Sequence, residues 1–309
     1  MRRHVSIARL VLFALFLPFA GCGDNGVVGK TGNKKEIYVS FPPLAQFARR
    51  IVGDTVAVHC PVPMGVDPAA WKPSRDEIAL FQTAPLVLVH GAELENWVDK
   101  ASLPASRVVD VSAGLENEFA QVVHPGHAHG AGGEGSHSHV DSHVWMDPTL
   151  AKRQAFAILE AVGARWPDLQ PAARGRYAGL AAEFDTLDKR WKALAPKLAA
   201  AKHYNASHNF AYLAKRYGFT FADELHLAPR AVPDAAVIEQ LGKDVAAGPK
   251  YLWWETEPSD DVKKALTDAL DFRHIVLDSG ESAGIEGSDV DYFEVQGKNL
   301  DVVDAALKN

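Results

Sequence analysis

Residues 171–198 read PAARGRYAGLAAEFDTLDKRWKALAPKL, and this stretch decides how the rest of the chain is organised. Its large apolar residues are spaced alternately by three and four positions, which is the spacing of one stripe along an α-helix. They are Tyr177, Leu180, Phe184, Leu187, Trp191, Leu194 and Leu198. Pro171 suits the first turn and Pro196 the end, so we predict a helix over residues 171–195. At 1.5 Å per residue this helix is about 37 Å long, which spans a whole small domain. A connection between two lobes explains such a length better than a place inside one lobe.

Short apolar strands alternate with helical segments on both sides of this helix. Before it, strands are predicted at residues 36–40, 56–60, 85–89 and 108–111, with helices at 44–52, 74–82 and 93–100. After it, strands at 202–206, 219–222, 251–254 and 274–277 alternate with helices at 209–217, 234–246, 259–270 and 291–307. This alternation predicts parallel sheets covered by helices on both faces. We therefore predict an α/β fold of two similar lobes, residues 35–165 and 201–309, joined by a long rigid linking helix within 166–200, with a cleft between the lobes.

The composition is that of a soluble globular protein. Of the 309 residues, 47% are hydrophobic and 23% are charged, and the formal net charge is −7 at pH 7. These values exclude a collagen-like chain, a disordered chain and a multi-span membrane protein, and the acidic balance argues against a nucleic-acid binder. The two cysteines, Cys22 and Cys60, are too few for a disulfide framework or a cysteine-rich zinc module.

The first residues have the features of an export signal. Two arginines at positions 2–3 precede an apolar run at residues 10–20, which is too short to span a bilayer as a helix but suits the core of a signal peptide. The small residues directly before Cys22 are similar to a bacterial lipobox. We expect a signal peptide at residues 1–21, lipidation of Cys22 and a flexible tether at 22–34. Secretion with cleavage near the same place is the alternative.

Several polar side chains follow predicted strands or precede predicted helices. In open α/β sheets, ligands bind beyond the carboxyl ends of the strands. The candidates are His90 and His143 in the first lobe, and His208, Glu255 and Asp278 in the second. Imidazole and carboxylate groups together suit Zn²⁺ or Mn²⁺, so these residues predict a divalent metal site. From the residues alone, hydrogen-bonding loop histidines and acidic helix caps remain alternatives.

A second group of histidines lies in the first lobe. Residues 124–139 read HPGHAHGAGGEGSHSH, a glycine-rich stretch that cannot pack a core. Its histidines are His124, His127, His129, His137 and His139. A short histidine-rich tract favours accessory metal capture by a loop at residues 123–140, and a flexible linker with incidental histidines is the alternative.

Six stretches of the chain occur in the order found in one known family. They are Phe41-Pro42-Pro43-Leu44, the run from Asp67-Pro68 to Pro73-Ser74, the Gly-x-x-x-Glu-x-Trp pattern of Gly91 to Trp97, the His-x-Trp-x-Asp-Pro pattern of His143 to Pro148, Ser207-His208-Asn209 with Tyr212, and Asp278-Ser279 with Asp291-Tyr292 and Asn299-Leu300. Together they resemble the metal-binding receptors of bacterial zinc and manganese ABC importers, the group with a rigid linking helix. The resemblance covers nearly all of residues 36–309.

This resemblance implies that His143, His208 and Asp278 are metal ligands. The family's first ligand loop usually reads Asp-Pro-His, but here Ala69 occupies the place of the histidine, and a methyl group cannot coordinate a metal. Three protein ligands with water could hold the ion, or another residue could supply the missing donor. His90 and Glu255 are the candidates for that residue.

The site could also have drifted to another cargo lined by Trp71 and Trp97. The resemblance otherwise implies a substrate-binding protein in the periplasm or on the cell surface. It would be a lipid-anchored monomer that is not an enzyme, and it would carry Zn²⁺ or Mn²⁺ as cargo to an ABC permease and its ATPase. The alternatives are a zinc-dependent hydrolase, with Glu255 as general base, and a surface adhesion or structural protein that shares the fold.

Overall fold

The computed structural model describes residues 35–124, 137–206, 209–281 and 291–308, which belong to one compact unit, Lys35–Asn309. The first lobe contains a four-stranded sheet in the order β2-β1-β3-β4, and all neighbouring strands are parallel. The strands are β1 (Glu36–Val39), β2 (Ala57–His59), β3 (Leu86–Val89) and β4 (Val108–Asp110). Its first helices are α1 (Pro42–Val52) and α2 (Arg75–Thr83), and Ser74 begins α2 with a capping box shared with Glu77.

The second lobe repeats this architecture with a sheet in the order β10-β9-β7-β8, again with parallel neighbours. Its strands are β7 (His203–Asn205), β8 (Phe221–Glu224), β9 (Lys250–Trp254) and β10 (Phe272–Val276). Its helices are α5 (Ala211–Tyr217), α6 (Ala235–Asp244), α7 (Asp260–Leu270) and α8 (Tyr292–Ala306). Every residue of β9 is buried, as expected for a central strand covered on both faces.

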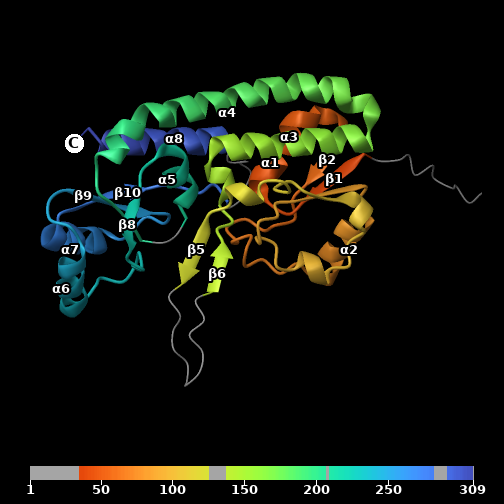
Figure 1. Ribbon diagram of the computed structural model, residues 1–309. Coiled ribbons are helices and arrows are strands. Elements are labelled where there is room, and N and C mark those ends of the chain that lie inside the picture. Colours follow the sequence, from red (N-terminus) through yellow and green to blue (C-terminus); the bar gives the residue numbers. More distant parts are fainter. Residues whose placement is uncertain (1–34, 125–136, 207–208, 282–290, 309) are drawn as a thin grey trace, which may run out of the picture. The chain divides into compact units, whose positions relative to one another are not determined.

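Two long helices connect the sheets. Helix α3 (Pro148–Arg165) belongs to the first lobe, and α4 (Gln170–Ala199) continues from it into the second. Helix α4 packs against α1 and α3 along its N-terminal part and against α8 along its C-terminal part (Figure 1). Six of the seven predicted stripe residues are buried, because this face of α4 covers both lobes. The predicted α/β fold of two lobes and one long linking helix is therefore confirmed.

The two lobes share one hydrophobic core. A single cluster of buried side chains extends from Ile37 in β1 through the stripe of α4 to Trp253 in β9. Polar contacts add to it, since the Trp145 Nε1–H donates to the carbonyl oxygen of Ser279 at 2.8 Å, and the Tyr292 hydroxyl donates to the carbonyl oxygen of Trp145 at 2.7 Å. Such a continuous core opposes a wide hinge motion between the lobes.

The helix predicted at residues 93–100 is wrong. Only the 3₁₀ turn Val98–Lys100 forms there, because Gly91, Ala92 and Glu93 all have positive φ angles, between 48° and 76°. A side chain at Gly91 would also lie 2.0 Å from the Asp110 carboxylate, so the turn requires glycine.

The histidine-rich stretch is also more ordered at its ends than predicted. Its flanks pair as an antiparallel hairpin of β5 (Gln121–His124) and β6 (His137–Val140). The segment between these strands lies outside the described residues.

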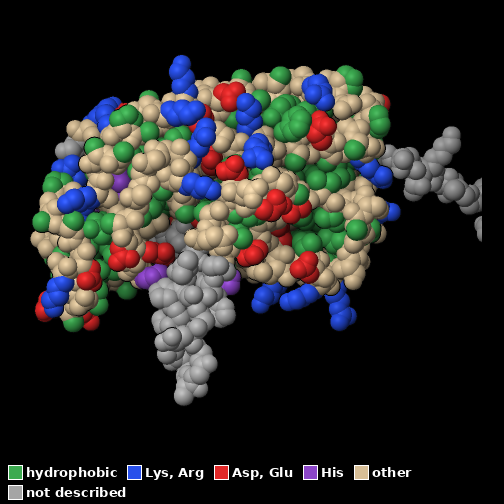
Figure 2. Space-filling view, viewed as in Figure 1, with side chains coloured by type: hydrophobic (Ala, Val, Ile, Leu, Met, Phe, Trp, Pro, Cys, Tyr) green, Lys and Arg blue, Asp and Glu red, His purple; other side chains and the backbone are tan. Residues whose placement is uncertain are grey.

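The surface is mixed in charge. Among the described residues, acidic and basic side chains are interspersed on the face drawn in Figure 2. In the part of the chain that the structure describes, no helix combines the length and apolar character needed to cross a bilayer.

Candidate metal centre

His143 lies where the chain passes from β6 towards α3. It precedes the 3₁₀ turn Val144–Met146, and Asp147 then caps α3. The side chain of Trp145 in this turn is fully buried and reaches the second lobe, so it anchors the segment at the boundary between the lobes. The His143 residue is only 9% exposed.

Asp141 orients the imidazole of His143. One carboxylate oxygen, Oδ1, accepts hydrogen bonds from the His143 backbone N–H at 2.9 Å and from its ring Nδ1 at 2.7 Å. The Asp141 side chain is completely buried. Because Nδ1 is engaged in this way, Nε2 is the nitrogen available for a metal ion, as in many metal-ligating histidines with a carboxylate partner.

Two carboxylates of the second lobe lie close to the His143 ring. Glu255 directly follows β9, and Glu281 comes five residues after β10. The His143 Nε2 lies 3.6 Å from Glu281 Oε2, and one donor atom from each of His143, Glu255 and Glu281 lies within 4.8 Å of the others. Tetrahedral zinc with bonds of about 2.0–2.1 Å needs donors roughly 3.3 Å apart. The three side chains therefore need only small shifts to hold one ion.

The electrostatics of this cluster favour a cation. Burial raises the pKa of Glu255, and the neighbouring Glu281 carboxylate raises it further. Burial would lower the pKa of His143, but hydrogen bonds with Asp141 and Glu281 outweigh it and raise that pKa to about 10. The imidazole thus holds a proton among three carboxylates, and a divalent cation could take the place of that proton.

Glu255 is also positioned by its neighbours. Its Oε2 accepts a hydrogen bond from the Asn209 side chain. The buried Oε1 atom of Glu255 has no hydrogen-bond partner among the described residues. A buried carboxylate oxygen without a donor is a ready ligand for a cation.

Asp278 does not join this group in the part of the chain that the structure describes. Its residue is exposed, and its Oδ1 accepts a hydrogen bond from the Gly280 backbone at 2.7 Å. Its backbone is held on both sides by the Asn299 amide. Asp278 lines a cavity of about 620 Å³ that Glu255 also borders. The structure thus brings Glu255 and Glu281, rather than Asp278, to His143.

Neither Ala69 nor His90 supplies an additional metal ligand in the structure. Ala69 is exposed, and its backbone N–H is bonded to Asp67 Oδ1 at 2.8 Å. The His90 ring is fully buried, with Nε2 2.8 Å from the Ser142 carbonyl oxygen and Nδ1 3.2 Å from the Gln154 amide. Burial lowers the pKa of His90 to about 3. With both nitrogens engaged, this neutral imidazole supports the backbone beside His143.

The two tryptophans considered as a lining for another cargo pack against each other. The ring centroids of Trp71 and Trp97 are 5.7 Å apart, and both rings contact Phe81. All three belong to a separate buried cluster of the first lobe. Their positions indicate a core role.

Several predicted residues lie outside the described residues or are described only in part. His208, Cys22, His127 and His129 lie outside them. His124 and His137 are described by their strand positions alone, and His139 is exposed.

Asp141 and Glu281 are the functional candidates that sequence reasoning missed. Asp141 is only two residues from His143, and a carboxylate so close to an expected ligand could have been interpreted as its orienting partner. Glu281 gave no comparable signal, because nothing in the sequence places it nearer to His143 than Asp278.

Comparison with known proteins identifies the family of this chain. Residues 37–306 match the family model described as the periplasmic zinc-uptake complex component A, ZnuA. The chain belongs to the ZnuA family. The high-affinity zinc uptake system protein ZnuA of Bacillus subtilis is 30% identical over 316 residues, and the match covers 96% of each chain.

Solved structures show the same fold. The metal-dependent lipoprotein YcdH of Bacillus subtilis has a TM-score of 0.74 at 26% identity, covering 88% of this chain and 98% of YcdH. The Zn(II)-bound ZnuA-like domain of Streptococcus pneumoniae AdcA has a TM-score of 0.70 at 25% identity, covering 89% of this chain and all of that domain. The ZnuA family consists of extracytoplasmic transport components, as its description as periplasmic states.

Proposed function

We propose that this protein is an extracytoplasmic receptor that captures Zn²⁺ and delivers it to an ABC importer. The observation that carries the proposal is the meeting of His143 from one lobe with Glu255 and Glu281 from the other, in a chain of the ZnuA family. An ion held by both lobes favours the arrangement in which they are closest, because only that arrangement provides all the ligands. The permease and its ATPase are the partners expected for such a receptor.

For the ligand set we propose His143 and His208 as the imidazole donors. Glu281 and Glu255 are the carboxylate candidates that geometry supports, and Asp278 is the one that the family resemblance supports. One or two carboxylates beside imidazoles suit zinc, and each added carboxylate makes Mn²⁺ a better cargo. Manganese is therefore the second cargo to test.

The hairpin β5–β6 supports accessory capture by the histidine-rich loop. Its register pairs His124 with His137, so the backbone brings the two ends of the histidine-rich tract side by side. Replacement of His124, His127, His129, His137 and His139 by Asn is expected to remove weakly bound zinc and to leave the tight site. Equilibrium dialysis at increasing zinc concentrations measures both classes of site.

Lipid attachment at Cys22 is a further part of the proposal. The name of the similar protein YcdH includes the word lipoprotein, which supports it. Cys22→Ser is expected to release the protein from membranes after export, and mass spectrometry of the wild-type N-terminus is expected to show acyl chains. An unmodified N-terminus in the membrane fraction contradicts this attachment. We also propose that the receptor is a monomer, which light scattering tests.

The test of function is uptake in cells that lack the protein. Expression of the wild type is expected to restore zinc accumulation in chelator-treated medium, whereas His143→Ala is not. His226→Ala is the matched control, because His226 is exposed, pairs with Glu224 and lies outside the cluster. Equal accumulation with wild type and His143→Ala contradicts the proposed function. Hydrolysis of esters or peptides that stops on chelation would support the hydrolase alternative, which no relative described above favours.

A further inference from the structure

The short helix α5 follows the expected ligand His208 in the sequence, and its side chains contact the segment that contains the expected ligand His143. It begins three residues after His208 in the sequence and belongs to the second lobe. Tyr212 and Arg216 are four residues apart in this helix, so they lie on the same face. Both side chains reach the first-lobe segment 141–147, which contains His143.

Tyr212 holds the beginning of this segment. Its hydroxyl donates a hydrogen bond of 2.6 Å to the carbonyl oxygen of Asp141, and the residue is 1% exposed. Asp141 is the residue whose carboxylate fixes the ring of His143. Tyr212 therefore fixes the backbone of the group that orients the ligand.

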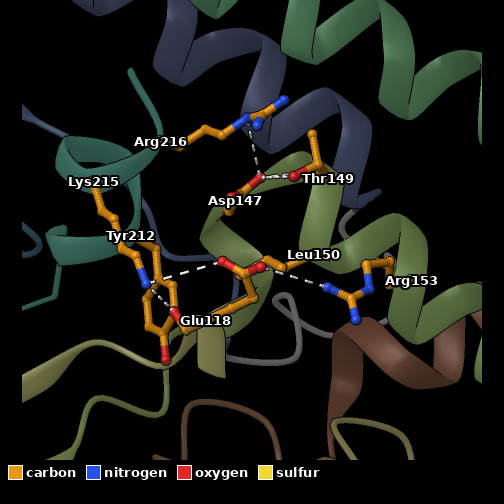
Figure 3. A pocket seen from close by; sticks show the side chains of 8 residues that line it. All are labelled: Glu118, Asp147, Thr149, Leu150, Arg153, Tyr212, Lys215 and Arg216. Carbon is orange, nitrogen blue, oxygen red and sulfur yellow. Dashed lines mark hydrogen bonds and ion pairs between the residues drawn. The ribbon is translucent and has the colours of Figure 1, made fainter. Parts of the chain in front are cut away.

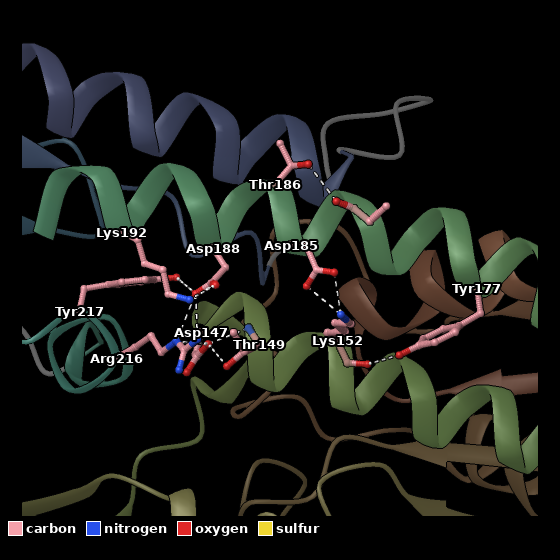
Figure 4. A network of polar contacts seen from close by, with 11 residues as sticks. Asp147, Thr149, Lys152, Tyr177, Asp185, Thr186, Asp188, Lys192, Arg216 and Tyr217 are labelled. Carbon is pink, nitrogen blue, oxygen red and sulfur yellow. Dashed lines mark hydrogen bonds and ion pairs between the residues drawn. The ribbon is translucent and has the colours of Figure 1, made fainter.

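Arg216 lies at the other end of the segment. Its Nη2 and Nε donate to Asp188 Oδ1 in α4 at 3.0 and 3.2 Å, and its Nε lies 4.0 Å from Asp147 Oδ1. Figure 4 shows this guanidinium between the linking helix and the N-terminal cap of α3. The same helix face thus contacts residues 141–147 at both ends and ties them to α4.

The contact between α5 and α3 is partly polar and incompletely filled. A cavity of about 210 Å³ separates the two helices beside Tyr212 and Arg216 (Figure 3). Glu118, Thr149, Arg153 and Lys215 also line it. The Tyr212 ring also packs with Val144 and Leu150 in a cluster of buried side chains, so Tyr212→Phe removes the hydrogen bond and keeps this packing.

We propose that Tyr212 and Arg216 are positioning residues for the cargo site. They hold the His143 segment of one lobe against the helix that follows His208 in the other, so the ligands of the two lobes keep a fixed relative position. This inference rests on the proposed function. It adds that metal affinity depends on side chains of α5 that are not themselves ligands.

The test compares two tyrosines that make the same kind of hydrogen bond. Tyr212→Phe removes the bond to Asp141, whereas Tyr251→Phe removes a bond of 3.2 Å to the Ala306 carbonyl oxygen within the second lobe. Both changes are made in the exported protein after Asn replaces the histidines of residues 124–139, so that only the cleft site is titrated. Zn²⁺ dissociation constants come from competition with a chelator, and the visible spectrum of bound Co²⁺ reports the ligand geometry.

Tyr212→Phe is expected to weaken Zn²⁺ binding about fivefold and to change the Co²⁺ absorption bands, because a net hydrogen bond is worth about 1 kcal/mol. Tyr251→Phe is expected to change neither, although both variants melt at lower temperatures. Arg216→Gln provides a second variant, which is expected to weaken binding, with partial recovery in Arg216→Lys.

Wild-type affinity and an unchanged Co²⁺ spectrum in both Tyr212→Phe and Arg216→Gln overturn the inference and leave the proposed function standing. A parent protein that binds neither Zn²⁺ nor Co²⁺ overturns the proposed function itself, and this inference with it.

Discussion

Replacement of Asp141 by Asn tests how the site prepares its imidazole ligand. The buried Asp141 carboxylate accepts two hydrogen bonds from His143, at 2.9 Å from the backbone and 2.7 Å from the ring. Asn has nearly the same shape and keeps an oxygen acceptor, but it carries no charge. A hydrogen bond to a charged group is worth about 1.5–3 kcal/mol and a neutral one about 1 kcal/mol. The expected loss is therefore about 0.5–2 kcal/mol, or roughly 2- to 30-fold in the zinc dissociation constant.

The assay is competition for Zn²⁺ with a fluorescent chelator, in the protein whose loop histidines are replaced by Asn. Asp234→Asn is the control, because Asp234 caps α6 in the second lobe through the Val237 backbone N–H, and Asn caps helices about equally well. The control is expected to bind zinc like the parent. A zinc affinity of Asp141→Asn within about twofold of the parent refutes the orienting role of this carboxylate.

Four further predictions concern the same site. Hydrogen bonds raise the pKa of His143 from 6.5 to about 10. The protonated ring therefore contributes fully to the stability of the metal-free protein below pH 6.5, and this contribution is lost as the pH rises towards 10. Melting temperatures of the metal-free protein across this pH range measure the loss. Zinc affinity is expected to rise over the same range, because zinc displaces the proton, and calorimetry in buffers of different ionisation enthalpy detects the released proton. Glu281→Gln is expected to weaken zinc binding at least about tenfold, and Asp278→Asn is expected to weaken it considerably less. A larger loss of zinc affinity in Asp278→Asn than in Glu281→Gln favours the ligand set implied by the family. His90→Ala is expected to lower the free energy of unfolding by about 1–3 kcal/mol, because the Ser142 carbonyl and the Gln154 amide lose their partner, with zinc affinity almost unchanged. A large loss of affinity in His90→Ala contradicts the structural role of that ring.

The parts of the fold that were predictable are those with strong periodicity. The stripe of α4 is visible in the sequence because each of its large residues packs on one of the lobes. The capping box of α2 confirms the helix start predicted at Ser74. The region after β3 was not predictable, because three successive positive φ angles break a sequence that otherwise favours a helix. The hairpin was missed because histidine and glycine are typical of loops and hide the strand pairing at its base.

The site, like the fold, has some parts that the sequence predicts and others that it does not. His143 was predictable because it lies within a motif and precedes the capped helix α3. The closeness of Glu281 to His143 was not, because it depends on which way a short segment turns after β10. In the structure, the Asp278 carboxylate turns to the Gly280 backbone and leaves Glu281 beside His143. Likewise, the sequence alone does not reveal that His90 is engaged by Ser142 and Gln154.

The most direct test of the account is calorimetric titration of the exported protein with Zn²⁺ and Mn²⁺, with and without residues 123–140. The account predicts one tight zinc ion per chain that remains after deletion of the loop and is lost in His143→Ala. Zinc binding that disappears with the loop, or that is unaffected by His143→Ala, contradicts the claim that the cleft between the lobes holds the cargo.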